Sequence, residues 1–270
     1  MKVLLVARSF TRGGAATGAA TLGLALEAAG LDVVRVSADG AKPVWRTTER
    51  VIERALFDAE THCLTVGPPS IDLAAKIAEH RPDIVQLCDI SANTISTEAL
   101  ASTDVPTVHR MSDLWPYHGP QHYAETAGSA PRLAQSFFKA GSFGGFTPTA
   151  RVAPSKWLAE TVSGTRPHII PNAVVSDKGL RPKALRDQPL RLGFISGKLT
   201  DPRKGLARLE RVMDTLPQGL ATLHTYGAGK PPAFVRDNAG PFEKANRTRV
   251  YRDIDVLICP SAQDLSLIHI

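Results

Sequence analysis

The chain has 270 residues, enough for one large domain or two smaller domains with separate cores. Its composition is typical of a globular protein, and no apolar run approaches the roughly 20 residues of a membrane-spanning helix. The net charge of +6 favours anionic partners such as nucleotides, phosphates or an acidic membrane surface, although a merely basic surface explains it equally well. The first residues are too short for a signal peptide, and the scattered Cys63, Cys88 and Cys259 predict a reduced, cytoplasmic protein without a cysteine-bound metal.

The first 175 residues alternate apolar strands with amphipathic helices. The chain begins with a strand over 2–10, a glycine-rich loop over 11–18, a helix over 19–30 and a strand over 31–38. Further helices are predicted over 44–60, 71–81, 96–102 and 155–164, and further strands over 82–90, 105–111 and 167–175. This alternation is typical of a doubly wound parallel sheet, which predicts an N-terminal Rossmann-like domain over 1–175.

A polar segment without apolar periodicity, 176–189, is the predicted linker. The alternation then resumes with strands over 190–196, 221–227 and 254–261 and helices over 206–216 and 242–253. These three strands predict a partial C-terminal domain over 190–264. Within the linker, the basic stretch 178–186 is a candidate membrane contact, although a solvated linker is the favoured interpretation.

Three loops that follow strands contain glycines, and two of them are candidate anion sites. Gly13, Gly14 and Gly18 precede a helix and suit a phosphate, but they do not form G-x-G-x-x-G, and a plain tight turn explains them equally well. Basic side chains in the loop 197–205 precede the next helix and suit a diphosphate, with a solvated basic turn as the alternative. The loop over 226–230 is uninformative by itself.

The segment 109–125 concentrates polar and aromatic groups after a strand, and loops on a rigid scaffold commonly carry function. His109, His118 and His122 raise the possibility of a zinc site. No carboxylate or cysteine completes a zinc pattern, so a loop that binds a sugar or an acceptor is the better interpretation.

Six segments, in order from residue 13 to 264, together resemble a known family. They are GGAATGAATLGLALEAAGLDV, SDLWPYHGPQHY, VAPSKWLAE, IIPNAV, DPRKG and DVLICPSAQD. The chain resembles family 4 of the retaining glycosyltransferases (GT-B, glycosyl transferases group 1), and the second segment resembles a subgroup of exopolysaccharide and O-antigen enzymes. The resemblance implies an α/β GT-B fold with two Rossmann-like domains facing across a cleft, the second of them incomplete here. It implies sugar transfer, with retention, from a UDP- or GDP-linked donor to a saccharide or lipid-linked acceptor.

The resemblance also implies roles for individual residues. The donor diphosphate would be held, without a metal or cofactor, by Gly13, Gly14, Lys198, Arg203 and Lys204, with Gly227 and Gly229 beside the nucleotide. Asp113 and His122 are the catalytic candidates, and Trp115, His118 and Tyr123 would lie on the acceptor side. Three positions depart from the usual motifs: Ser112 and Gln121 stand where the family has His and Cys, and Lys198 stands where it has Arg. The resemblance implies no nucleic-acid partner, and a lipid-linked acceptor would place the protein at the inner face of the membrane.

The end of the sequence predicts a C-terminal truncation. The family continues into a Glu-x7-Glu motif that binds the donor, and nothing corresponding to it follows Asp264. The last six residues, 265–270, match a translation of a sequencing-adapter end, so we interpret them as a non-native tail. A non-catalytic fragment of such an enzyme is therefore an alternative. A nucleotide-sugar epimerase or NAD-dependent oxidoreductase is another, although the first loop lacks the dinucleotide fingerprint.

Overall fold

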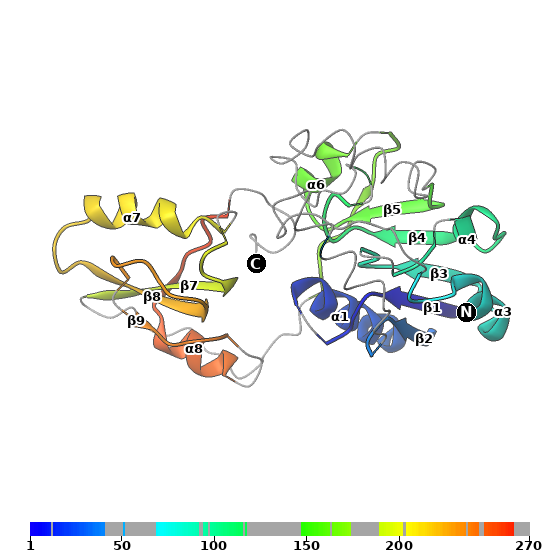
Figure 1. The fold of residues 1–270 in the computed structure, drawn as a ribbon, viewed down its shortest axis with the longest axis horizontal. Helices are drawn as coiled ribbons and strands as arrows, with labels where there is room; N and C mark the ends of the chain where they lie inside the picture. Colours follow the sequence, from blue (N-terminus) through cyan, green and yellow to red (C-terminus); the bar gives the residue numbers. More distant parts are fainter. Residues whose placement is uncertain are drawn as a thin grey trace. The chain divides into compact units, whose positions relative to one another are not determined.

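The computed structural model describes residues 1–11, 13–40, 51, 69–91, 94–96, 98–115, 117, 147–162, 164–173, 189–201, 204–235, 237–242 and 246–261. The chain divides into two compact units, built mainly from Met1–Val175 and from Ser176–Gln263 (Figure 1). Most of the predicted helix 44–60, almost all of the predicted linker and the six-residue tail lie outside the described residues. Each unit is a parallel sheet with helices, so the predicted α/β class is confirmed.

The first unit is a six-stranded parallel sheet in the order β2-β1-β3-β4-β5-β6. Its strands are β1 (Lys2–Ala7), β2 (Asp32–Ser37), β3 (Ile84–Leu87), β4 (Thr107–Arg110), β5 (Ala150–Ala153) and β6 (His168–Ile169). Its helices are α1 (Gly14–Ala28), α3 (Leu73–His80), α4 (Glu98–Ala101) and α6 (Lys156–Thr161). Because every strand runs the same way, the carboxyl ends of all six meet at one edge of the sheet.

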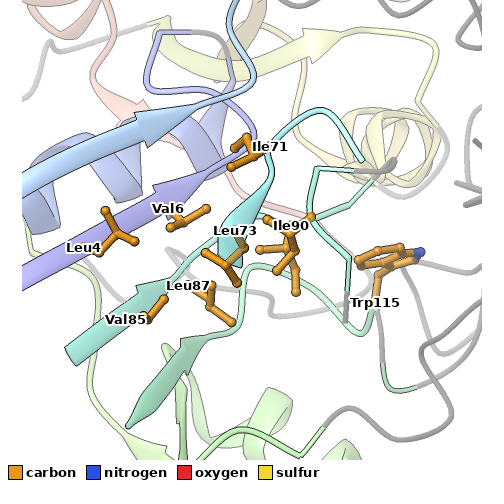
Figure 2. Close-up of a cluster of buried hydrophobic side chains, with 9 residues drawn as sticks. Leu4, Val6, Ile71, Leu73, Val85, Leu87, Ile90 and Trp115 are labelled. Carbon is orange, nitrogen blue, oxygen red and sulfur yellow. The ribbon is translucent and has the colours of Figure 1, made fainter. Parts of the chain in front are cut away.

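Two apolar layers enclose this sheet, because successive strand residues point to opposite faces. On one face, Leu4 and Val6 pack with Leu87 and with Leu73 of α3 (Figure 2). On the other face, Leu5 and Ala7 pack with Cys88 and with Ala19 of α1. Covering both faces explains why β1 is a nearly uninterrupted apolar run rather than an alternating one.

Helix α1 begins at Gly14, five residues earlier than predicted. Gly13, at the N-cap, has φ 91°, a conformation that favours glycine, and the alanine-rich run that follows has high helix propensity. At the other end, Gly30 has φ 83° and follows the C-cap Ala29, so the predicted glycine stop is confirmed. The early start moves Gly14 and Gly18 from the predicted loop into the helix.

Helix α6 begins where the sequence predicts it. The hydroxyl of Ser155 accepts a hydrogen bond from the backbone N–H of Leu158 at 3.1 Å, which satisfies one donor of the first turn. Leu158 and Ala159 then pack under the end of β4 against Met111 and Leu114. This helix therefore supports the segment that follows β4.

The second unit is a four-stranded parallel sheet in the order β10-β7-β8-β9. Its elements are β7 (Leu190–Lys198), α7 (Leu206–Thr215), β8 (Ala221–Ala228), β9 (Asp237–Asn238), α8 (Arg247–Asp253) and β10 (Val256–Leu257). Helices α7 and α8 cover opposite faces of the sheet (Figure 1). Strand β9 was not predicted, because two polar residues give no apolar pattern.

No helix within the described part of the chain is long and apolar enough to cross a membrane.

Candidate functional site

The carboxyl edge of the first sheet carries linked polar groups. The backbone N–H of Arg8, directly after β1, donates to the carbonyl of Asp89 after β3 at 2.6 Å, and its guanidinium donates to the Ser91 hydroxyl at 3.3 Å. The Ser91 hydroxyl donates in turn to the Asp89 carboxylate at 2.7 Å. Ligands of open α/β sheets bind at this edge, and here its loops are held together by hydrogen bonds.

The N-terminus of α1 opens at the same edge. Gly13 and Gly14 are exposed, and a Cβ added to either would meet no atom within 4 Å. The N-cap residue, Gly13, has no side chain with which to cap the first turn. The free N–H groups and the positive end of the helix dipole therefore suit an anion, as the predicted phosphate role of these glycines requires.

His109, near the end of β4, is a structural residue. Its Nδ1 lies 2.7 Å from the Tyr117 hydroxyl, and its ring also hydrogen-bonds the backbone of Cys88. Burial lowers the pKa of His109 to about 3, and the nearby guanidinium of Arg151 adds to the effect, so the imidazole is neutral. Arg151 lies 4.7 Å from the centre of the Tyr117 ring, which extends the contact.

The zinc alternative loses support from this geometry. His109 is only 1% exposed and is engaged by Tyr117 and Cys88, so it cannot turn toward a shared ion without breaking both contacts. Within the described residues, no group of three or more His, Cys, Asp or Glu could hold a metal ion. His118 and His122 lie outside those residues.

The loop after β4 places Asp113 and Trp115 differently. The Asp113 carboxylate is partly exposed and accepts a hydrogen bond from the backbone N–H of Trp115 at 2.9 Å, which closes a turn. Trp115 is 2% exposed and packs in the core with Ile90 and Leu87 (Figure 2). The buried Trp115 ring anchors the loop, and the acceptor-side role of Trp115 stays a prediction. Tyr123 lies outside the described residues.

The carboxyl edge of the second sheet brings two predicted loops together. Lys198 ends β7 in register with Ala228 at the end of β8, and the N–H of Leu199 donates to the Ala228 carbonyl at 2.9 Å. Gly227 has no room for a side chain, because a Cβ would overlap the carbonyl oxygen of Ser196. Gly229, with φ 101°, has only a methyl group of Thr200 near its missing Cβ. The absence of a side chain at Gly227 therefore lets β7 and β8 approach closely, while Gly229 leaves space around its Cα.

The N-terminus of α7 completes this edge. Gly205 has φ 76°, and a Cβ there would overlap the carbonyl oxygen of Pro260, so the motifs DPRKG and DVLICPS are in direct contact. Lys204 is exposed directly before this glycine, which has no side chain with which to cap α7. Lys198 and Lys204 thus border a helix N-terminus that favours an anion. Arg203 lies outside the described residues.

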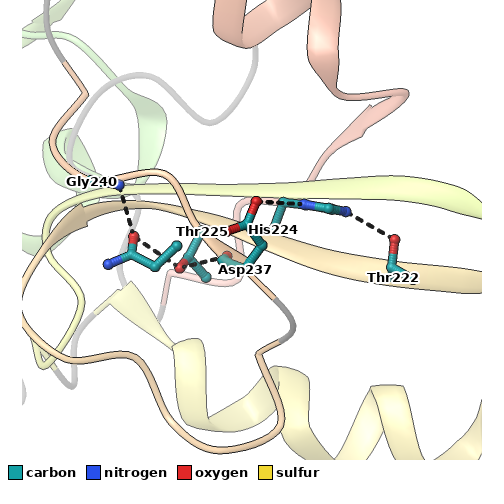
Figure 3. A network of polar contacts seen from close by, with 6 residues as sticks. Thr222, His224, Thr225, Asp237 and Gly240 are labelled. Carbon is teal, nitrogen blue, oxygen red and sulfur yellow. Dashed lines mark hydrogen bonds and ion pairs between the residues drawn. The ribbon is translucent and has the colours of Figure 1, made fainter.

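A separate polar network lies farther along the second sheet. His224 of β8 is 2.9 Å from the Thr222 hydroxyl through Nε2 and 3.6 Å from the Asp237 carboxylate through Nδ1 (Figure 3). Asn238 accepts hydrogen bonds from the Thr225 hydroxyl and from the N–H of Gly240. These contacts tie the two-residue strand β9 to β8, and we interpret the network as structural.

Sequence reasoning missed Arg110, the last residue of β4. It is 7% exposed, and its Nη2 donates to the side-chain oxygen of Asn172, which follows β6. The sequence did carry a signal for Arg110, because it is a charged residue at the end of an apolar strand. Charged residues are rarely buried without a partner, so this position could have been singled out.

These features define an α/β protein in which a helix begins directly after a glycine at the carboxyl edge of each of two parallel sheets. Residues 12–178, more than half of the chain, match the sequence model of glycosyltransferase family 4, so the chain belongs to that family. The prediction of a glycosyltransferase is confirmed at this level. No curated protein sequence matches the chain.

The chain is also similar to solved structures of glycosyltransferases. The enzyme SsfS6 of Streptomyces sp. SF2575, complexed with thymidine diphosphate, is 17% identical over 95% of this chain and 75% of its own, with a TM-score of 0.41. MurG of Acinetobacter baumannii is 13% identical over 96% and 73%, with a TM-score of 0.47. HepE of Anabaena, in complex with UDP and glucose, is 14% identical over 90% and 70%, with a TM-score of 0.43.

Proposed function

We propose that this protein transfers a sugar, with retention of configuration, from a UDP- or GDP-linked donor to a saccharide or lipid-linked acceptor in polysaccharide biosynthesis. The observation that carries the proposal is the arrangement of Lys198 and Lys204 around the uncapped start of α7. Both ammonium groups are exposed, and the adjoining Gly229 leaves space for a ligand. Family membership supports a transferase.

The chemistry of these residues suits a departing nucleoside diphosphate. As the glycosidic bond to the donor breaks, negative charge accumulates on the diphosphate, and Lys204 and Lys198 lower the energy of that charge. The N–H groups at the start of α7 add a fixed positive potential. The charges needed are supplied by the protein itself, so the proposal requires no metal and no cofactor.

The acceptor is proposed to meet the first unit. Asp113 lies in the loop after the carboxyl end of β4 and remains partly exposed, so its carboxylate can accept a hydrogen bond from a sugar hydroxyl. Gly13 and Gly14 offer an open helix start at the same edge for phosphate oxygens. His122 and His118 remain proposed acceptor contacts.

The decisive experiment measures binding and turnover separately. The full 270-residue chain is titrated with UDP, GDP and their hexose conjugates, and nucleotide release is then measured with a saccharide or lipid-linked acceptor, with and without EDTA. We expect one nucleotide to bind, release to need the acceptor, and EDTA to change the rate little. NMR of the product would read its anomeric configuration.

The outcomes separate the alternatives. Absence of binding by every nucleotide sugar would overturn the proposal. Binding without turnover in any acceptor would support the non-catalytic alternative, in which the chain binds the donor only. Conversion of the free nucleotide sugar to its epimer, or binding of NAD(H), would favour the epimerase or oxidoreductase instead.

A further inference from the structure

The guanidinium of Arg110 is buried and only partly hydrogen-bonded. Its Nη2 donates to the side-chain oxygen of Asn172, whereas its Nη1 is buried with no hydrogen-bond partner among the described residues. No described carboxylate forms an ion pair with it. The Cys88 thiol also hydrogen-bonds the guanidinium, but it cannot compensate the charge, because burial raises the pKa of Cys88 to about 11 and keeps the thiol neutral.

A second arginine, Arg35 of β2, packs against the same helix and shows the usual arrangement. Arg35 packs against Gly23 of α1 as Arg110 packs against Gly18, and in both cases a Cβ on the glycine would meet a guanidinium nitrogen within 3 Å. Arg35, however, donates to both carboxylate oxygens of Glu27, at 2.5 and 2.9 Å. Arg110, the more deeply buried of the two, has no such carboxylate.

The Arg110 guanidinium, Nη1 included, packs against α1 at Gly18. The Cα–Cβ bond of a helical residue tilts toward the helix N-terminus, so the space that a Gly18 side chain would fill lies over the preceding turn. All three terminal atoms of the Arg110 guanidinium occupy that space. Gly14 lies one turn earlier on the same helix face and has no atom within 4 Å of its missing Cβ.

We infer that Arg110 and the first turn of α1 together bind an oxyanion, a carboxylate or a phosphate, of a substrate. The guanidinium supplies the unpaired Nη1–H donors, and the N–H groups at the start of α1 supply the others. The ligand then provides the negative charge that no described residue supplies to Arg110. That the oxyanion belongs to a donor or an acceptor rests on the proposed transferase function; the anion site itself does not.

The first test uses the unmodified chain. Sodium phosphate is titrated at constant ionic strength, and the backbone amide resonances of three glycines in α1 are followed by NMR. We expect saturable shifts at Gly14 and Gly18 and little change at Gly23. Shifts that do not saturate, or that appear equally at all three, would overturn the inference. The result does not depend on catalysis, so a failed turnover assay leaves it standing.

The second test uses a matched pair of variants. In Arg110→Gln the phosphate affinity should fall at least about tenfold, the size expected for loss of a charge-assisted contact. In Arg35→Gln it should stay within about twofold of wild type, because that guanidinium is already paired. Equal affinity in wild type and Arg110→Gln contradicts the inference. If Arg110→Gln does not fold, Arg110→Lys is used instead. Lysine keeps the positive charge but lacks the bidentate guanidinium, so Arg110→Lys should bind phosphate more weakly than the wild type.

Further titrations identify the source of the oxyanion. UDP against uridine tests a donor phosphate, and glucuronate against glucose tests a carboxylate on a sugar. Saturable shifts at Gly18 with UDP alone assign the site to the donor, and shifts with glucuronate alone assign it to an acidic sugar. Absence of shifts with UDP, glucuronate and phosphate refutes the site.

Discussion

The Tyr117 hydroxyl lies 2.7 Å from Nδ1 of His109, although eight residues separate them and only His109 belongs to the sheet. This hydrogen bond fastens the loop after β4 to the strand that precedes it. The same loop carries Asp113, the partly exposed catalytic candidate, and Trp115, whose ring is in the core. Two buried contacts therefore support the segment on which the proposed acceptor chemistry depends.

Replacing Tyr117 with Phe should destabilise the first unit. The ring and its contact with Arg151 remain, but Nδ1 of the buried His109 loses its partner, at a cost of about 1–3 kcal/mol in the free energy of unfolding. Urea unfolding followed by tryptophan fluorescence measures this, because all three tryptophans belong to residues 1–175. The double variant His109→Leu/Tyr117→Phe removes both polar partners and should recover part of the loss. Wild-type stability in Tyr117→Phe would contradict this account.

The neutral His109 should make the first unit sensitive to acid. Its pKa is about 3 in the folded state, against about 6.5 in an unfolded chain, so between these values the unfolded state binds more protons. The contribution is complete above about pH 6.5 and is lost as the pH falls, by up to about 1.4 kcal/mol per pH unit. Urea midpoints between about pH 7 and about pH 5 measure it. In His109→Leu the urea midpoint should depend less steeply on pH than in the wild type. Equal slopes of the midpoint against pH in the two proteins would count against a buried neutral imidazole.

Two glycines in the second unit have similar positive φ angles but different surroundings, so their substitution separates backbone strain from steric overlap. Gly205 and Gly219 have φ 76° and 78°, but a Cβ on Gly205 would overlap the Pro260 carbonyl, whereas one on Gly219 would meet nothing within 4 Å. Gly219→Ala should cost about 1–2 kcal/mol from its backbone conformation alone. Gly205→Ala should cost about 1–3 kcal/mol more, because Pro260 must move. Hydrogen exchange of the β7 and β8 amides measures both variants, and equal destabilisation would show that the Pro260 contact is unimportant.

Lys204 should matter for turnover more than for stability. In Lys204→Met, the proposed stabilisation of the leaving diphosphate is lost, and kcat should fall by about 10²–10³-fold. Lys76→Met is the control, since Lys76 lies on α3 in the first unit and pairs with Glu79 at 2.6 Å. Its kcat should be unchanged. Steady-state kinetics with a single nucleotide sugar measure both, and an unaltered kcat in Lys204→Met would remove Lys204 from the proposed chemistry.

Much of the fold follows from local patterns. The apolar runs of β7 and β8 and the amphipathic α7 were predicted within two residues and that of β1 within three, because buried parallel strands and helices leave strong periodic signals. The start of α1 was misplaced, since two glycines suggested a loop where alanines and packing against β1 favour a helix. Strand β9 was missed because its two polar residues pair through the backbone with β8.

The candidate site was less predictable than the fold. The loops before α1 and α7 were predicted as anion sites, and in the structure each of these helices begins directly after a glycine. Whether an aromatic residue in a loop faces a ligand or the core depends on contacts distant in sequence, and Trp115 packs on residues from β3 and its following loop. Arg110 was overlooked for the same reason, because its environment is made by α1 and Asn172, far from it along the chain.

The alternation of β4 gives its last two residues opposite environments. His109 faces a neutral, closed contact with Tyr117, while Arg110 faces the glycine side of α1. A slip of β4 by one residue would bring a permanent cation into the neutral contact and an imidazole against the helix, so both faces would reject it. His109 and Arg110 together therefore fix the register of β4 in the sheet. The apolar residues of so short a strand would by themselves distinguish only weakly between the correct register and a shifted one.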